Sequence, residues 1–192
     1  VQARDELERA LNALLTLSRD ATSVSLVQAM ERTFERARTA VENQSRTDIA
    51  VQVAVLEGGF RRLVMDSAFT AAAQDDLELA RTRLAHLADA MAFRAEDGAA
   101  LAAASDATGL RLAFEAGTAD AIAAQVQVAE RLMTEDRDAG YVALAGAYGD
   151  SLAIQDSPRT DAALNQYLVA AAQAVVDADD DALSASLEGA NL

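Results

Sequence analysis

The last part of the chain contains acidic residues with the spacing of a calcium-binding loop. Asp177, Asp179 and Asp181 occupy positions 1, 3 and 5 of a window that closes with Glu188. These positions supply carboxylate ligands in an EF-hand, where a glycine at position 6 permits the sharp turn of the loop. Position 6 of this window is Ala182. The pattern therefore matches the charges of a calcium loop but not its backbone requirement.

A junction between two helices explains the same acidic residues. One helix is predicted to end near Val176, and Asp180 or Asp181 is expected to cap a short helix that carries Leu183 and Leu187. Aspartate is favoured at a cap because its carboxylate accepts hydrogen bonds from the free N–H groups of the first turn. We favour this interpretation and expect no metal site.

The rest of the chain offers little for catalysis. His86 is the only histidine, and cysteine is absent, which excludes thiol chemistry, thiolate metal sites and disulfides. A carboxylate-bridged di-iron bundle would require Glu three residues before a histidine, and this position is Arg83. The sequence contains no glycine-rich phosphate loop and no Gly-x-Ser-x-Gly motif. We therefore expect a protein that is not an enzyme and has no cofactor.

Two adjacent glycines precede two adjacent arginines in the apolar stretch VAVLEGGFRRLVM. A glycine inside a helix costs about 1 kcal/mol relative to alanine, so Gly58 and Gly59 mark either a kink or helix boundary, or a close approach of another backbone or a ligand. Arg61 and Arg62 could present a guanidinium fork to a carboxylate. In an acidic protein the alternative is an ion pair with a nearby Asp or Glu.

Aromatic residues are scarce, at 4% of the chain. Tyr141 and Tyr148 lie seven residues apart among glycines. Such residues either line a small-molecule pocket or fill the core with the hydroxyl reaching the surface, and the sequence leaves both interpretations open.

The composition predicts that helices position these residues. The chain has 192 residues, of which 52% are hydrophobic, with nine glycines and one proline. Much of the apolar share is alanine, which suits closely packed helices better than a sheet. The formal net charge of −15 disfavours binding to nucleic acid or to anionic lipid. No apolar run approaches 18 residues, so the sequence predicts no membrane span within these residues.

Apolar residues recur at steps of three and four in the first half, which is the helical period. The opening stripe, 7–41, predicts one long helix with a local distortion at 18–23. A second stripe covers 49–63, and a third covers 77–91 after the N-cap pair Asp75–Asp76. The first half is therefore predicted to be a series of long helices.

The second half continues in the same way. Residues 95–109 are alanine-rich and are expected to join two halves of the protein, and a turn at 117–120 is expected to precede a stripe over 122–133. The segment 139–158 contains three glycines and is the weakest helix candidate, and Pro158 is expected to begin the next helix. The sequence thus predicts an all-α, up-down helical bundle with long helices. It forms a single domain over 1–192, or two stacked helical modules with a junction near 95–109.

Two segments of the second half resemble a known family. RLAFEAGTADAIAAQVQVAERLM, followed by RTDAALNQYLVAAAQAV, is similar to the ligand-binding region of bacterial chemoreceptors and sensor histidine kinases of the helical-bundle type. The resemblance covers 107–178 and is closest to the helical bimodular subtype, in which two bundles are stacked on very long helices. It implies a periplasmic domain that binds a small molecule between helices and signals by sliding or rotating a terminal helix.

The same resemblance sets the expected partners. A small ligand, for which an anion is one candidate, is expected between helices, the domain is expected to be a homodimer, and membrane attachment would come only from flanking segments. The candidate ligand-binding residues are chosen by type and position rather than from a family motif. The arginines would bind an anion and the aromatic residues would form walls: Arg61, Arg62 and Arg111, and Phe60, Phe114 and Tyr167. The alternative is a helical scaffold or adaptor, in the cytoplasm or the periplasm, that binds another protein.

Overall fold

The computed structural model describes residues 9, 24–154, 157 and 162–190 of the chain. The first part of the predicted opening helix, its distortion at 18–23 and the predicted helix start at Pro158 lie outside the described residues. Within the described residues every regular element is an α-helix, so the predicted all-α helical bundle is confirmed.

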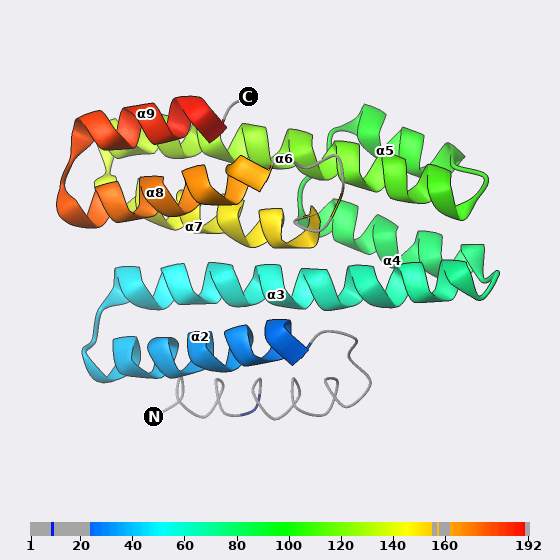
Figure 1. Cartoon of the computed structure of the whole chain (residues 1–192), viewed down its shortest axis with the longest axis horizontal. Coiled ribbons are helices and arrows are strands. Elements are labelled where there is room, and N and C mark those ends of the chain that lie inside the picture. The colour runs from blue at the N-terminus through cyan, green and yellow to red at the C-terminus, as the bar shows by residue number, and fades with distance from the viewer. Residues whose placement is uncertain (1–8, 10–23, 155–156, 158–161, 191–192) are drawn as a thin grey trace.

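The described helices alternate in direction along the bundle (Figure 1). Two of them, with 28 and 29 residues, run along most of its length. In chain order the helices are α2 (Val24–Glu42), α3 (Arg46–Ala73), α4 (Leu77–Ala90), α5 (Ala95–Ala103), α6 (Ala107–Glu135), α7 (Arg137–Ile154), α8 (Ala162–Asp177) and α9 (Asp180–Ala190).

The core is divided along the two long helices, α3 and α6. One buried cluster joins the second half of α3 to α4, α5 and the first half of α6, with Leu84, Leu101 and Phe114 at its centre. Another joins the second half of α6 to α7, α8 and α9, around Leu144 and Leu168. A third, smaller cluster lies between α2 and the first half of α3. The long helices therefore connect all three clusters into one bundle.

The predicted modules and their junction can be placed on this arrangement. The change from the first cluster to the second falls in the middle of α6. Residues 95–109 form α5 and the start of α6, and α5 lies at one end of the bundle (Figure 1). Whether the chain folds as one domain or as two modules stays a prediction.

Aspartate and serine side chains begin several helices. Ser45 accepts a hydrogen bond from the N–H of Asp48 at the start of α3, and Asp76 accepts one from Leu79 at the start of α4. The predicted cap at Asp75–Asp76 is thus confirmed, with Asp76 as the cap. These bonds satisfy N–H groups that the helix itself cannot pair.

The acidic segment near the chain end is a helix junction, as the sequence analysis favoured. α8 ends at Asp177 and α9 begins at Asp180, so most of the apparent calcium window is helical. The cap differs from the prediction, because Asp179 rather than Asp180 or Asp181 accepts the hydrogen bond from the N–H of Ala182, at 3.0 Å. Among the described residues, no three acidic or histidine side chains are grouped in a way that could hold a metal ion.

Four helices end without glycine. The residues that follow α2, α3, α4 and α8 have φ between 54° and 64°, a conformation that usually requires glycine; they are Gln44, Asp75, Ala92 and Ala178. In each case the next residue donates its N–H to a carbonyl five residues back, as Asp76 does to Ala71 at 3.0 Å. These Schellman bonds stop the helices by backbone geometry, with no marker in the sequence.

The glycines instead lie inside helices, and the turn predicted at 117–120 was wrong because these residues are part of the continuous helix α6. The weakest helix candidate, 139–158, forms α7 up to Ile154. A Cβ atom on Gly117 would lie 2.3 Å from the Phe93 ring. Gly117 therefore makes room for an aromatic side chain and does not break the helix.

Gly58 marks the crossing of α3 and α7. A Cβ atom placed on Gly58 would lie 2.3 Å from the Cα of Gly149, and one placed on Gly149 would lie 2.7 Å from the carbonyl oxygen of Ala54. A kink, a helix boundary and a close approach were all compatible with the sequence at Gly58, and the structure shows a close approach of two backbones.

No described helix is both long and apolar enough to cross a bilayer.

Candidate ligand-binding groove

A groove of about 480 Å³ lies between α2, α3, α7 and α8. We refer to it as the α2–α7 groove. One wall is a single face of α7, because Tyr141, Leu144, Tyr148 and Leu152 recur at the helical period and all line the space. Gly59 contributes from α3, and the Met30 side chain of α2 packs where a Cβ atom on Gly59 would lie, 2.8 Å from its Cγ.

The opposite wall comes from α2. Leu26 and Met30 give this wall an apolar surface, and Thr33 lies beside them with its hydroxyl donating to the carbonyl of Ala29 at 3.0 Å. Arg32 and Arg36 stand one turn apart at the rim, exposed to solvent. The groove thus combines an apolar interior with two cations at its edge.

The two rim arginines differ in their pairing from other described arginines of this acidic protein. On the same helix, Arg38 is paired with Glu35 and Glu42. Among the described residues, neither Arg32 nor Arg36 has an ion pair. An unpaired pair of guanidinium groups beside a concave apolar surface attracts a carboxylate or another anion.

Tyr141 keeps its phenol proton at the groove wall. Burial raises the pKa of Tyr141 above its ordinary value, and the negative charge of Asp48 raises it further. The side chain therefore offers a neutral hydroxyl, which can donate or accept a hydrogen bond.

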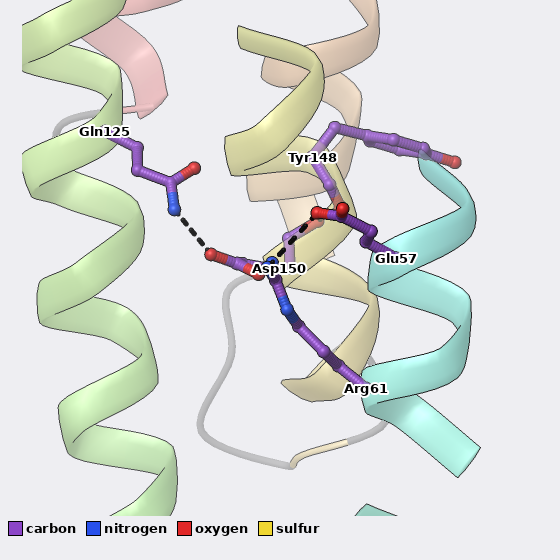
Figure 2. A network of polar contacts seen from close by, with 6 residues as sticks. Glu57, Arg61, Gln125, Tyr148 and Asp150 are labelled. Atoms are coloured by element: carbon purple, nitrogen blue, oxygen red, sulfur yellow. Dashed lines mark hydrogen bonds and ion pairs between the residues drawn. The ribbon is translucent and has the colours of Figure 1, made fainter. Parts of the chain in front are cut away.

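The other face of α7 is tied to its neighbours by a buried polar network (Figure 2). Asp150 has no exposed surface and forms an ion pair with Arg61 of α3. Gln125 of α6 donates from Nε2 to Oδ2 of Asp150 at 2.6 Å. Nη2 of Arg61 also lies 3.4 Å from Oε2 of Glu57, whose side chain is exposed to solvent. A single carboxylate therefore joins three helices.

Further contacts hold the last turns of α7. Arg62 donates to Oδ1 of Asp66 at 3.0 Å and to the carbonyl of Leu152 at 3.1 Å. The Ser151 hydroxyl lies 2.5 Å from Oδ1 of Asn165 on α8. The groove-lining helix is thus bonded to α3, α6 and α8 within one short segment.

Burial changes the acidity of Asp150. Desolvation raises the pKa of this carboxyl above its ordinary value, and Glu57 adds to the rise. Arg61 and Gln125 act in the opposite direction without cancelling the effect of burial. Asp150 consequently accepts a proton at a higher pH than an exposed aspartate does.

The structure places the three predicted arginines away from the α2–α7 groove. Arg61 and Arg62 are brought together but are held by internal partners, Asp150 and Asp66 among them. The guanidinium of Arg111 stacks 4.0 Å from the centre of the Phe69 ring. The local pairing that the sequence analysis weighed for Arg61 and Arg62 is therefore present, and their predicted ligand contacts stay predictions.

The three predicted aromatic residues are also dispersed. Phe60 packs at the α2–α3 cluster that adjoins the groove, and Phe114 is fully buried with its ring 5.6 Å from that of Phe93. The ring of Tyr167 covers Gly189 of α9. None of the three is among the groove-lining residues, and their role as ligand walls likewise stays a prediction.

Sequence reasoning missed the arginines of the groove. Arg32 and Arg36 lie in MERTFERAR, where the spacing of one turn puts both on one side of a helix. Tyr141 and Tyr148 were singled out, and both line the groove. The helical spacing was visible in each segment, but the sequence does not show that α2 and α7 line the same groove.

Comparisons with known proteins give no assignment for this chain. No protein-family model matches it, and no match is found among curated proteins or solved structures. The groove, the network behind it and the bundle are thus the basis for a functional proposal.

Proposed function

We propose that this chain is a non-catalytic, extracytoplasmic ligand-sensing domain of a chemoreceptor or sensor kinase. It binds a small anionic molecule in the α2–α7 groove. The observation that carries the proposal is the position of Arg32 and Arg36, which have no ion pair among the described residues, beside an apolar wall between four helices. The bundle supports it, since α3 and α6 extend through separate core clusters, as in the stacked bundles that the sequence resembles.

The groove is suited to a ligand with an apolar body and a negatively charged end. Its volume of about 480 Å³ falls in the range of small-molecule sites. Met30, Leu144 and Tyr148 would contact the body, and the guanidinium groups of Arg32 and Arg36 would bind the anionic end.

The position of the groove gives ligand binding a means to move a helix. Of the described helices, α2 packs mainly against α3, while the groove lies between α2 and the pair α7 and α8. A ligand that contacts both α2 and the α7–α8 side would have different contacts in two positions of α2. The ligand would then bind one position more tightly, and this difference in affinity displaces the equilibrium between the two positions. Helix shifts of about 1–2 Å are a known form of such a transition.

A thermal-shift screen against organic acids and amino acids tests the proposal. A ligand at about 100 times its Kd stabilises a protein by about 2.7 kcal/mol, and for a domain of this size that raises Tm by about 5–10 °C. We expect one chemical class of anion to give such a shift. Uniform absence of a shift across the screen would contradict ligand sensing.

Two variants locate the site. The double variant Arg32→Ala, Arg36→Ala should bind the selected anion at least about tenfold more weakly, because each lost charge-assisted hydrogen bond is worth about 1.5–3 kcal/mol. Arg38→Ala is the matched control, since Arg38 lies on the same helix but is paired with Glu35 and Glu42. Equal affinity of the double variant and the wild type, measured by titration calorimetry, would place the site elsewhere.

A helical scaffold that binds a protein is the alternative function, and exposed valines on α8 favour it. Val169 and Val176 have 54% and 64% of their surface exposed and lie seven residues apart, on one face of the helix. A homodimer of the sensor could use the same face. Sedimentation of the wild type and of Val176→Asp would show whether this face forms a contact between two chains.

A further inference from the structure

α7 presents two different faces to its surroundings. Tyr148 and Leu152 face the α2–α7 groove, whereas Asp150, between them in sequence, is buried on the other side and contacts Arg61 and Gln125. Residues two apart on a helix point in nearly opposite directions. Asp150 and two residues of the groove wall therefore share one turn of the α7 backbone.

The charged surroundings of Asp150 come mainly from one helix. α3 supplies Arg61 and Glu57, which together form a chain from the buried carboxylate to solvent. α6 supplies the neutral amide of Gln125. From the described part of α8, the nearest polar group in this region is the neutral Asn165, which contacts Ser151. The ionised form of Asp150 thus depends on Arg61 for compensation of its charge.

We propose that Asp150 is a proton-responsive positioning residue for the α2–α7 groove. In the ionised state its carboxylate holds α7 against α3 and α6, and its protonation changes this packing and the groove wall with it. The effect of this change on ligand sensing rests on the proposed function, but the response of α7 to protonation of Asp150, which we call the switch, does not.

The donor and acceptor inventory explains why protonation must rearrange the network. Arginine has five N–H donors and no acceptor, so a proton on the oxygen that faces Arg61 would force the guanidinium away. A proton on Oδ2 would give the buried acid an O–H donor, whereas both hydrogen-bonding neighbours of the carboxyl, Arg61 and the Nε2 of Gln125, are donors; rotation of the Gln125 amide would supply its Oε1 as the acceptor. The Gln125 side chain lies against Gly146 of α7, where an added Cβ would be 3.0 Å from Oε1. Both outcomes disturb contacts that hold α7.

Loss of the negative charge also releases Arg61 toward solvent. Its remaining carboxylate partner among the described residues is Glu57, whose side chain is 58% exposed. The attraction that joins α3 to α7 is then replaced by one within α3. Because Gly58 and Gly149 bring the two backbones together directly beside this pair, a change in α3–α7 spacing has no side chain to absorb it.

An NMR titration of the ligand-free protein tests the proposal. The ¹³Cγ shift of Asp150 reports its protonation, and the backbone amides of Tyr148 and Leu152 report the groove wall. We expect both amides to titrate with the same midpoint as Asp150, and this midpoint to lie above the ordinary pKa of an aspartate. In Asp150→Asn the shifts of the two amides should no longer change at this midpoint. In the matched control Asp89→Asn, at an exposed position, the change should remain.

The proposal is overturned if Asp150 titrates while the two amides stay constant, or if the amides titrate identically in Asp150→Asn. Should Asp150→Asn fail to fold, the comparison of midpoints within the wild type decides alone. The titration uses no ligand. A failure of the switch can therefore be told apart from a failure of the sensor proposal, which the thermal-shift screen measures separately.

Discussion

Asp150 is a carboxylate with no exposed surface, and it depends on two donors from other helices. Removing a carboxylate from water is expensive, and an ion pair repays the cost only when the remaining hydrogen-bond sites are also satisfied. Arg61 and Gln125 each supply a donor, but burial still raises the pKa of Asp150. Compared with water, the fold therefore disfavours the ionised form of Asp150.

The pH dependence of stability follows from this pKa. Because the pKa of Asp150 is higher in the folded than in the unfolded chain, the folded state binds more protons between the two values, and the stability contribution decreases as the pH rises through this window. It is fully present below the ordinary aspartate pKa. Urea unfolding from about pH 4 to about pH 7 should show this decrease in the wild type and in Asp89→Asn, but not in Asp150→Asn. Parallel profiles for all three proteins would contradict the assignment.

Asparagine and alanine at position 150 should differ strongly in stability. The amide of Asp150→Asn can accept from Arg61 and bond with a rotated Gln125, so the free energy of unfolding should change by less than about 1 kcal/mol. Asp150→Ala leaves both donors without their acceptor in a buried site and should cost about 2–3 kcal/mol. Urea unfolding at neutral pH measures both values, and similar losses for the two variants would show that the hydrogen bonds contribute little.

This residue pair also marks a limit of sequence reasoning. Arg61 was recognisable as an arginine of interest, with ion pairing in an acidic protein as the alternative reading. Its partner is 89 residues away in sequence, and nothing in GAYGDSLAI distinguishes Asp150 from an exposed aspartate. The sequence shows the types of the two side chains, Arg61 and Asp150, but their contact depends on how α3 and α7 cross.

At the scale of the helices, glycine permits close packing inside helices instead of ending them. Glycines at 58, 117 and 149 lie inside helices and permit close packing, while Gln44 and Ala178 end helices in the conformation that glycine usually adopts. The hydrophobic period and the aspartate cap predicted α3 and α4 correctly. The error at 117–120 and the low rank of 139–158 as a helix both came from treating glycine as a helix breaker, since packing against another helix can outweigh its low helix propensity.

Substitutions of glycine should reveal this difference. Gly58→Ala places a Cβ atom 2.3 Å from the backbone of Gly149 and should destabilise the protein by about 2–3 kcal/mol, because two backbones cannot separate without moving whole helices. Gly98→Ala is the control: no atom lies within 4 Å of its Cβ position in α5. The control should gain up to about 1 kcal/mol from helix propensity.

Chemical denaturation of the two glycine variants supplies the measurement. A stabilising Gly58→Ala substitution would mean that α3 and α7 are not in direct backbone contact in solution. The same experiment bears on the groove, because Gly59 follows Gly58 and lines it. A separation of α3 from α7 would widen the space between the helices that form its walls.

At the scale of the whole molecule, the long helices α3 and α6 organise three core clusters. The all-α class was predictable because apolar stripes, abundant alanine and few breakers all favour helices. The α2–α7 groove was not, since it depends on the placement of α2 beside α7 and α8, which are more than 90 residues away along the chain. None of the six predicted ligand-binding residues lies in its wall, whereas Tyr141 and Tyr148, for which a pocket was one of two interpretations, and the unselected Arg32 and Arg36 do.

The central claim, that a ligand bridges α2 and the α7–α8 side and so moves α2, can be measured as a distance. The chain has no cysteine, so spin labels can be attached to Glu35→Cys on α2 and Ala170→Cys on α8, both at exposed positions. We expect the organic acid selected in the thermal-shift screen to change the mean distance between the labels by about 1–2 Å. The same acid should leave the distance unchanged in the Arg32→Ala, Arg36→Ala background. An identical distance distribution with and without saturating ligand in the otherwise wild-type chain would contradict the account.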